Sequence, residues 1–290
     1  MEKKHKKEFV ASKNQLLIDF LKENLESKSK NNIKSILKRG SSVINGKPIT
    51  QFNYEIKKGD KIIIQEKIAD PINDIEIIYE DDDFFVINKP VGLLTVPAND
   101  IYEKTAYKVV SEYARKNNTG NLLVVHRLDK ETSGVLVFVK SEKLKQKLQE
   151  NWNELVLKRG YCAVVCGKVL KKEDKITTLI AETRTKIMYT TKNSEMGKEA
   201  ITNYKVIKTS NKYSLLDINI ETGRKNQIRL HMKEMGHPIV GDKKYGAPTN
   251  PIRRLGLHAN ILEIKHPITG EIFKFVSEIP NDFSKLIEKK

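Results

Sequence analysis

Short apolar runs bounded by turn-forming residues recur along most of the chain. Residues 122–125 and 135–139 are rich in Val and Leu, and short β-branched runs of this kind are typical of buried strands. The same pattern predicts strands near residues 75–79, 84–88, 134–140, 159–166, 198–206, 213–220, 255–264 and 271–276. Helices are predicted near residues 103–116, 142–153 and 226–235. Because strands and helices do not alternate regularly, we expect an α+β fold with a long, mostly antiparallel mixed sheet and a central cleft, not a doubly wound sheet.

The N-terminal quarter of the chain has a different pattern. Helical spacing predicts two amphipathic helices, one from Leu16, Leu17, Phe20, Leu21 and Leu25 and one from Ile33, Ile36 and Leu37 that ends at Gly40. Asn45-Gly46 predicts a hairpin turn, and Gly59-Asp60 predicts a turn into a strand at 61–66. We expect four parts: a basic tail (1–12), a small domain (13–68), a linker around Ala69-Asp70-Pro71 (69–75) and a larger domain (76–290).

Two helices followed by a small sheet resemble the αL-type RNA-binding module first known from ribosomal protein S-four. We expect a phosphate-contacting surface there, made of Lys28, Lys30, Lys34, Lys38 and Arg39. Contacts of this kind position RNA without reading its bases. The alternative is a solvated basic face that binds no ligand.

The charge of the chain favours a polyanionic partner. It has 53 Lys and Arg against 37 Asp and Glu, a formal net charge of +16. Fields of this sign attract nucleic acids, although Lys-rich proteins are common and total charge alone is weak support. The distribution says more, because residues 1–67 hold 16 Lys and Arg against 8 Asp and Glu, half of the net charge.

One carboxylate lies in a polar turn between two of the predicted strands. Residues 126–134 spell His-Arg-Leu-Asp-Lys-Glu-Thr-Ser-Gly, so Asp129 is flanked by Arg127 and Lys130. Neighbouring cations favour the ionised form of a carboxyl group, and loops held between core strands often carry reactive groups. Spacing alone fits an ordinary polar connection equally well.

Residues 126–134 resemble the central motif of the RluA/RluC/RluD-type pseudouridine synthases, in which the Asp of His-Arg-Leu-Asp is catalytic. Five further segments match that family in order and spacing, over about residues 76–280. They are 88–97 with a Lys-Pro-x-Gly pattern, 159–167 with a tyrosine-bearing strand, 223–232, 236–242 and 255–259. Asn226 departs from the pattern, because the family usually has His there. This departure bears on a helix start or a backbone contact, not on the reaction class.

The resemblance implies a role for each matching residue. Asp129 would be catalytic, attacking carbon 1′ or carbon 6 of the nucleoside or taking the 2′ proton, and the sequence does not choose among these routes. Arg229 would pair with Asp129, and Tyr161 would stack on uracil, at roughly 1–3 kcal/mol per base. Their ordinary alternatives are a surface Arg at a helix start and a half-buried strand Tyr.

Substrate binding is expected from four further residues. His126 and Arg127 would fill the space left by the flipped nucleotide or hold its phosphate, and a structural role is nearly as plausible for His126. Lys89 would in addition fix a loop under the catalytic turn. The four residues are His126, Arg127, Lys89 and Gln227.

No cofactor and no metal are expected. The isomerisation oxidises nothing and transfers no external group, and neither a dinucleotide-binding nor a phosphate-cradling glycine motif is present. Cys162 and Cys166 have no His or Cys partners nearby in the sequence, so we expect small packing residues and not a metal site.

The leading hypothesis is therefore an RNA pseudouridine synthase that acts on large-subunit (23S) ribosomal RNA, free or in precursor particles. Alternatives are a transfer-RNA enzyme of the same family and a non-catalytic RNA-binding assembly factor, which would not need Asp129, Tyr161 and Arg229 together. A hydrolase using Ser133 is a weaker alternative, since no G-x-S-x-G motif frames it. We expect a monomer in the reduced cytoplasm, without a membrane partner, because apolar runs are short and the charged N-terminus does not look like a secretory signal.

Overall fold

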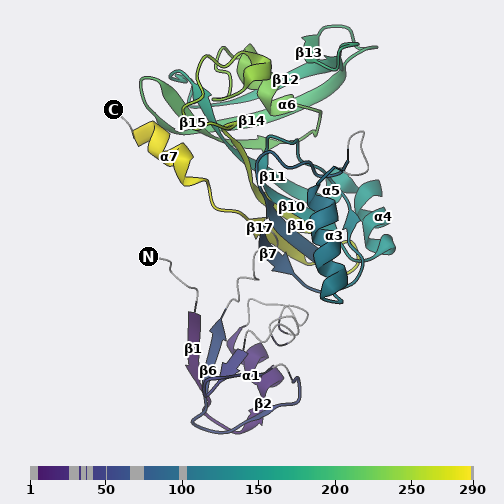
Figure 1. The fold of residues 1–290 in the computed structure, drawn as a ribbon, viewed down its shortest axis with the longest axis vertical. Helices are drawn as coiled ribbons and strands as arrows, with labels where there is room; N and C mark the ends of the chain where they lie inside the picture. Colours follow the sequence, from purple (N-terminus) through teal and green to yellow (C-terminus); the bar gives the residue numbers. More distant parts are fainter. Residues whose placement is uncertain are drawn as a thin grey trace.

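The computed structural model describes residues 6–25, 33, 37, 42–49, 51–65, 75–97 and 103–288. From residue 75 onward the chain builds one large sheet with helices packed on it (Figure 1). Its strands are β7 (Glu76–Glu80), β8 (Phe84–Lys89), β9 (Leu123–Val124), β10 (Ser133–Val139), β11 (Val156–Cys166), β12 (Glu173–Glu182), β13 (Met188–Thr191), β14 (Lys198–Thr209), β15 (Tyr213–Ile220), β16 (Leu257–Lys265) and β17 (Ile272–Val276). The helices are α3 (Ala106–Lys116), α4 (Glu142–Glu150), α5 (Trp152–Leu155), α6 (Gln227–Glu234), the 3-10 turn η1 (Lys243–Tyr245) and α7 (Asn281–Glu288).

The large sheet is mixed but mostly antiparallel. Its strands follow the order β13-β12-β14-β15-β11-β16-β10-β8-β7, while β17 pairs with β16 and β9 with β10. Within the described ranges, β10 and β16 form the one parallel pair. Gly134 lies in this pair at a φ of +117°, and a Cβ atom there would lie 2.0 Å from the carbonyl oxygen of Ala259. These observations confirm the α+β class and the mostly antiparallel mixed sheet.

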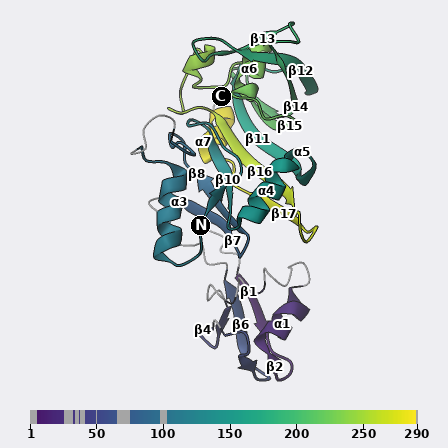
Figure 2. The same ribbon diagram turned by 90° about the vertical axis from the view of Figure 1, so that its right-hand side faces the viewer.

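The central strands are buried on both faces. All seven residues of β10 are buried. Leu136 and Phe138 pack in the cluster that includes α3, whereas Val135, Val137 and Val139 pack in the cluster that includes α4. Figure 2 shows α3 and α4 on opposite sides of these strands. A strand covered on both faces needs apolar side chains at every position, which explains the continuous run in the sequence.

Strand β11 joins the two halves of the sheet and has a similar division. Ala163 and Val165 face a cluster that includes α6, whereas Cys162 and Val164 face a cluster that includes α7. Cys162 is therefore a small core residue, and Cys166 is half-buried. Helix α6 is thereby fixed on the sheet beside β11, which matters for the site described below.

Three parts of the sheet domain differ from the sequence prediction. The helix expected at 142–153 is divided into α4 and α5, because the chain leaves helical geometry at Asn151 (φ −118°, ψ 30°). Strands β12 and β13 were missed, since β12 is half-exposed and mostly polar and carries no long apolar run. Helix α7 was also missed, although Phe283, Leu286 and Ile287 have helical spacing and are buried.

The N-terminal residues form a separate small sheet. The elements are β1 (Lys6–Val10), β2 (Gln15–Leu16), α1 (Leu17–Asn24), β3 (Ser42–Ile44), β4 (Lys47–Ile49), β5 (Glu55–Ile56) and β6 (Lys61–Gln65). The sheet order is β1-β6-β3-β4, and β2 pairs with β5. Asn45 and Gly46 both have positive φ (47° and 83°), as a tight hairpin turn requires, so the predicted first helix and hairpin are confirmed.

Other expectations for this region stay predictions or fall outside the described residues. Residues 6–10 of the predicted tail form β1, which pairs antiparallel with β6, and Phe9 packs edge-on against Phe20 with 5.8 Å between ring centroids. Ile33 and Leu37 of the second predicted helix are helical and buried. Residues 69–74 of the predicted linker and the five basic residues Lys28, Lys30, Lys34, Lys38 and Arg39 lie outside the described ranges. The division into two domains stays a prediction.

Candidate active site

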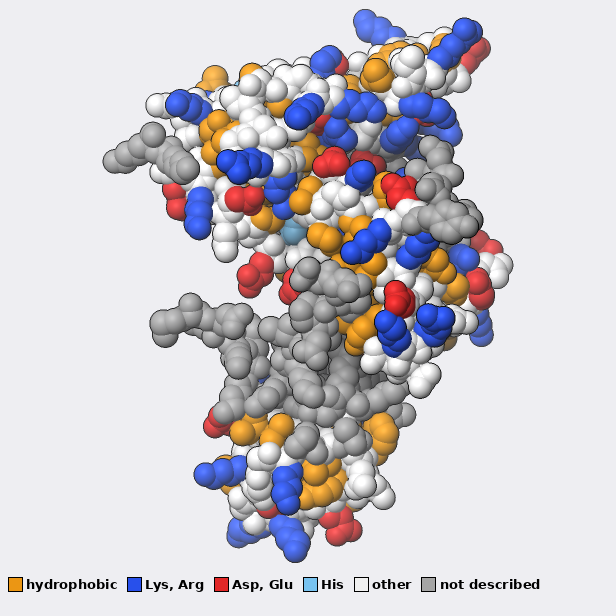
Figure 3. Space-filling view, viewed as in Figure 1, with side chains coloured by type: hydrophobic (Ala, Val, Ile, Leu, Met, Phe, Trp, Pro, Cys, Tyr) orange, Lys and Arg blue, Asp and Glu red, His pale blue; other side chains and the backbone are white. Residues whose placement is uncertain are grey.

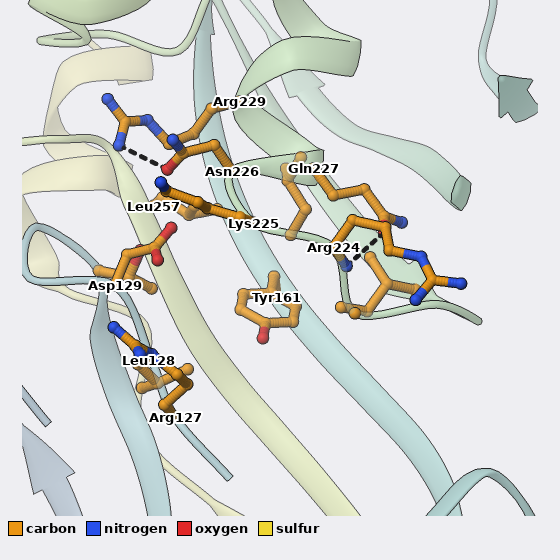
Figure 4. A pocket seen from close by; sticks show the side chains of 14 residues that line it. Arg127, Leu128, Asp129, Tyr161, Arg224, Lys225, Asn226, Gln227, Arg229 and Leu257 are labelled. Atoms are coloured by element: carbon orange, nitrogen blue, oxygen red, sulfur yellow. Dashed lines mark hydrogen bonds between the residues drawn. The ribbon is translucent and has the colours of Figure 1, made fainter. Parts of the chain in front are cut away.

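A cleft of about 450 Å³ brings together segments that are far apart in the sequence. Asp129, Tyr161 and Arg229 all line it, from the loop before β10, from β11 and from α6 (Figure 4). The other lining residues are Arg127, Leu128, Thr132, Ile220, Gly223, Arg224, Lys225, Asn226, Gln227, Ile228 and Leu257. The three residues proposed for catalysis therefore share one cavity.

The backbone on both sides of Asp129 is fixed. Thr95 is buried, and its hydroxyl donates to the carbonyl of Leu128 (2.9 Å) and accepts from the N–H of Leu128 (3.1 Å). On the other side, the carbonyl of Lys130 accepts from the N–H of Gly92 (2.9 Å). Gly92 has a φ of +82°, which glycine adopts without strain. The Asp129 side chain is thus presented from a loop held at the preceding and the following residue.

Lys89 supports this loop and does not line the cleft. Its side chain is fully buried, and Nζ donates to the carbonyl oxygens of Pro90 (3.0 Å), Leu93 (2.7 Å) and Lys130 (3.2 Å). Burial lowers the pKa of the Lys89 ammonium to about 8. With three carbonyl acceptors for three N–H groups, Lys89 has no donor left for RNA. The substrate-binding assignment is corrected, and the supporting role agrees with these contacts.

His126 is a structural residue. Its Nε2 accepts a hydrogen bond from the backbone N–H of Val137 (3.0 Å), and its ring packs on Trp152 with 5.4 Å between centroids. Strand β9 pairs with β10 only at Val139 and Phe138, so the imidazole occupies the place of the next strand residue. Burial lowers the pKa of His126 to about 4, so the ring is neutral at neutral pH. These contacts contradict a substrate-binding role and explain why β9 is shorter than predicted.

Arg229 forms an ion pair with Asp242. Its Nε and one terminal nitrogen donate to the two oxygens of Asp242 at 2.6 and 2.7 Å, and the other terminal nitrogen donates to Oδ1 of Asn226 at 3.1 Å. The guanidinium also lies over the ring of Tyr245, 5.2 Å from its centroid. The Asp242 pair, together with the nearby charge of Asp129, raises the pKa of Arg229 against the effect of burial. The edge of the guanidinium formed by Nε and one terminal nitrogen is therefore held by Asp242, and a contact with Asp129 stays a prediction for the remaining N–H groups.

Gln227 orients the loop before α6. Its Oε1 accepts from the hydroxyl of Thr222 (2.8 Å) and the N–H of Arg224 (3.0 Å), and its Nε2 donates to the carbonyl of Ile201 (2.9 Å) and the hydroxyl of Thr202 (3.0 Å). The side-chain amide is thereby satisfied within the protein. Gln227 forms part of the cleft wall, and its contact with the substrate stays a prediction.

Tyr161 presents a half-buried aromatic ring to the cleft. In Figure 4 the ring lies between Asp129 and the segment that contains Arg224 and Gln227. Burial, and secondly the charge of Asp129, raise the pKa of the Tyr161 hydroxyl to about 12. The phenol is therefore neutral at physiological pH, and its ring offers an apolar face to a flat ligand.

Basic side chains surround the opening. Arg127, Arg224 and Lys225 are exposed on the cleft, and Lys225 is steadied by an ion pair with Glu182. Lysine and arginine side chains also gather over the part of the molecule that carries β12, β13 and α6 (Figures 1 and 3). Fields of this sign favour a polyanionic ligand.

Ser133 is hydrogen-bonded to a histidine, yet it does not form a catalytic triad. Its hydroxyl lies 2.8 Å from Nδ1 of His258, and both residues are buried. Nε2 of His258 contacts the hydroxyl of Ser277 at 3.1 Å, where a triad would have a carboxylate. The hydrolase alternative is therefore wrong. In the described residues, no group of three His, Cys, Asp or Glu side chains could hold a metal ion, and no helix is apolar and long enough to cross a membrane.

Four residues of the site had no role predicted from the sequence: Asp242, Thr95, Arg224 and Lys225. Asp242 lies in the segment 236–242 that carries the family resemblance, but nothing in its spacing pointed to Arg229. Thr95 lies 33 residues before its partner Leu128, and no sequence pattern joins the two. Their roles follow from contacts between distant segments.

Comparison with known proteins agrees with this geometry. The family model of RNA pseudouridylate synthase matches residues 83–234. An uncharacterized RNA pseudouridine synthase of Bacillus subtilis, YhcT, is 34% identical over 245 residues, covering 81% of this chain and 80% of that protein. The ribosomal large subunit pseudouridine synthase D of Pasteurella multocida is 31% identical over 287 residues, covering 90% and 86%. The structure of human RNA pseudouridylate synthase domain containing 4 superposes with a TM-score of 0.60 at 25% identity, covering 72% and 90%. The chain belongs to the RNA pseudouridylate synthase family and is an RNA pseudouridine synthase.

Proposed function

We propose that this enzyme isomerises uridines of large-subunit ribosomal RNA and that Asp129 is its catalytic residue. The observation that carries the proposal is the shared cleft: a carboxylate on a fixed loop, an aromatic ring and exposed cationic side chains around about 450 Å³. A pocket of this size suits one small ligand. A single nucleoside with its phosphates would meet all three kinds of group at once.

The reaction would need only a positioned carboxylate. The bond from carbon 1′ of ribose to nitrogen 1 of uracil breaks, the base turns, and carbon 5 bonds to carbon 1′. The proton on carbon 5 is lost, and nitrogen 1 gains one, so nothing is oxidised. Asp129 would attack carbon 1′ or carbon 6, or take the 2′ proton, and each route requires it to meet the sugar or base at close range.

The uridine would have to leave its helix to reach Asp129. Base flipping costs a few kcal/mol of unstacking, and contacts in the pocket must offset that cost. Stacking of uracil on Tyr161 would stabilise the flipped base by roughly 1–3 kcal/mol. Arg127 is exposed beside Asp129 and would contact the phosphate of the flipped nucleotide or fill the space that it leaves.

Ribosomal RNA is the favoured target for two reasons. Relatives that cover most of this chain are named ribosomal large subunit pseudouridine synthase D, and the net charge of +16 suits a long polyanion. A transfer RNA would present the same chemistry. We further propose that the enzyme acts as a monomer in the cytoplasm, on free ribosomal RNA or on precursor particles.

The test of Asp129 uses RNA labelled with tritium at carbon 5 of uridine, because bond formation at that carbon releases the label. Asp129→Asn should abolish tritium release while RNA affinity stays within about twofold, since the substitution keeps the size of the side chain. Glu131→Gln, an exposed carboxylate two residues away, is the matched control and should release tritium at the wild-type rate. Turnover by Asp129→Asn would remove Asp129 from its role.

The target is identified by mapping pseudouridines in a strain that lacks this protein. Sites that disappear from large-subunit ribosomal RNA and return with the wild-type gene, but not with Asp129→Asn, would support the proposal. Sites that disappear only from transfer RNA would establish the alternative.

A further inference from the structure

The hydrogen bonds of Arg229 leave a defined part of its guanidinium unused. The group has five N–H donors. Two donate to Asp242 and one to Asn226. Two N–H groups remain, one on each terminal nitrogen, and the described residues provide no further acceptor for them. Arg229 is largely buried and lines the cleft, and the charge of Asp129 acts on its guanidinium.

Asp242 is itself held rigidly. It is almost fully buried, and its Oδ1 accepts the backbone N–H groups of Lys244 and Tyr245, both at 3.1 Å, in addition to Arg229. A carboxylate with four hydrogen bonds has little freedom to follow a moving guanidinium. The two-point contact with Asp242 therefore fixes both the position and the plane of the Arg229 head group.

Asn226 supplies the third contact from an uncommon backbone conformation. It is the N-cap of α6 with φ 54° and ψ 20°, in the left-handed region that Asn tolerates better than most residues. Its side chain does not cap the helix and instead accepts from Arg229. The residue at which this chain departs from its family thus faces the proposed catalytic centre.

We propose that Asp242 and Asn226 are positioning residues, which together hold Arg229 so that its two remaining N–H groups donate to Asp129 or to the nucleoside bound beside it. This inference rests on the proposed function. Asp242 also offsets the positive charge of the Arg229 guanidinium while it holds that group in place. Donors fixed before the reaction need no reorganisation during it, which is the condition for a lower barrier.

The first experiment removes the Asn226 contact without changing the backbone. Asn226→Gly keeps the left-handed conformation, because glycine adopts it freely, but removes the acceptor. We expect kcat on large-subunit ribosomal RNA to fall about tenfold with KM within twofold, as for an interaction used in the transition state. Asn226→Asp, which keeps an acceptor oxygen, should restore most of the rate. Asn118→Gly makes the same change at another left-handed, exposed asparagine (φ 50°) and should leave kcat unchanged.

The second experiment tests whether Asp242 acts through Arg229. Asp242→Asn should lower kcat about a hundredfold, again with little change in KM. In an Arg229→Met background the same substitution should have almost no further effect on kcat, because the group that it positions is gone. Circular dichroism and thermal unfolding establish the folded fraction of each variant, so the rates are compared per folded molecule. If a variant fails to fold, the Asn226 series carries the test alone.

Three outcomes would overturn the inference: wild-type kcat in Asn226→Gly and Asp242→Asn, an equal fall in Asn118→Gly, or fully additive effects in the Arg229→Met background. Tritium release by the wild-type enzyme distinguishes a failure of the positioning role of Asp242 and Asn226 from a failure of the proposed uridine isomerisation. If the wild-type enzyme is active while both positioning variants match it, only the inference fails. If the wild-type enzyme isomerises no uridine in ribosomal or transfer RNA, the proposed function fails and the inference fails with it.

Discussion

The two walls of the cleft are fixed by different forces. The Asp129 wall, residues 126–132, is held through its backbone by neutral hydrogen bonds from Thr95 and Gly92 and by the Lys89 ammonium. The Arg229 wall, residues 223–229, is held by a buried ion pair with Asp242 and by the amide of Gln227. The wall with the half-buried carboxylate thus depends on backbone hydrogen bonds, and the wall with the cation depends on charge compensation.

The two walls are therefore sensitive to different substitutions. Removing a neutral hydrogen bond costs about 1–3 kcal/mol when a buried partner is left unsatisfied. A buried charge without its partner costs more. We therefore expect substitutions behind the Arg229 wall to act first on stability and substitutions behind the Asp129 wall to act more on the placement of Asp129.

The largest effect should follow from Asp242→Ala. The substitution leaves the Arg229 guanidinium buried without a counterion, so the free energy of unfolding should fall by about 3–5 kcal/mol, as measured by urea unfolding. The double variant Asp242→Leu with Arg229→Met removes both charges and should recover most of that stability. A double variant as unstable as the sum of its single variants would show that the ion pair is not what fixes this wall.

Acid should weaken both walls. His258 contacts Ser133 beside the Asp129 wall, and His231 lies in α6 between the hydroxyls of Thr178 and Thr202. Burial lowers the pKa of each imidazole from 6.5 to about 4, so below pH 6.5 the unfolded chain binds protons that the folded chain does not. Their contribution to stability is complete above pH 6.5 and is lost as the pH falls toward 4. At pH 5 the loss should be about 2 kcal/mol for each residue, at 1.36 kcal/mol per pKa unit.

Urea unfolding at pH 7.5 and pH 5 measures this change in stability. His231→Gln and His258→Gln should each flatten the dependence by about a third, because the pKa of His126 is lowered by the same amount. If one variant removes the whole dependence and the other none, the two walls do not respond equally.

Thr95→Val should test the Asp129 wall more selectively. Valine has nearly the shape of threonine but leaves both backbone groups of Leu128 unpaired, so stability should fall by about 1–2 kcal/mol and kcat should fall with it. Thr95→Ser keeps the hydroxyl and is the control. A fall in stability with unchanged kcat per folded molecule would mean that the Thr95 hydroxyl does not place Asp129.

The smallest effect is expected from substitution of basic residues in the N-terminal region, outside both walls. Replacing Lys34 and Lys38 by Gln should weaken RNA binding and make its salt dependence less steep, by about 0.7–0.9 in the slope of log K against log salt for each phosphate that is no longer neutralised. Lys143 and Lys147, also four residues apart and on α4, are the matched pair and should have a smaller effect. Equal slopes in the two double variants would argue against a dedicated RNA-binding surface in the N-terminal region.

The sequence predicted most of the fold because the spacing of apolar residues along the chain indicates which side chains of a strand or helix are buried. The strands β7, β8, β10, β11, β14, β15, β16 and β17 were expected close to their observed positions, since strands in a buried sheet are continuously or alternately apolar. Strands β12 and β13 were missed because half-exposed strands need few apolar residues. The two-residue length of β9 was not predictable, because it depends on the imidazole of His126, which accepts the hydrogen bond from the backbone N–H of Val137.

For the candidate site, the sequence alone determined the kinds of group and their order along the chain: a carboxylate in a turn, a tyrosine on a strand and an arginine at a helix start. Local pattern and motif are sufficient for this, because each group belongs to one short segment. Only the tertiary structure decided their hydrogen-bond partners. Arg229 pairs with Asp242, Lys89 donates to the carbonyl groups of the loop, and Gln227 accepts from Thr222. Such pairings depend on which segments the sheet brings within about 3 Å of one another, and hydrogen bonds depend steeply on that distance and direction.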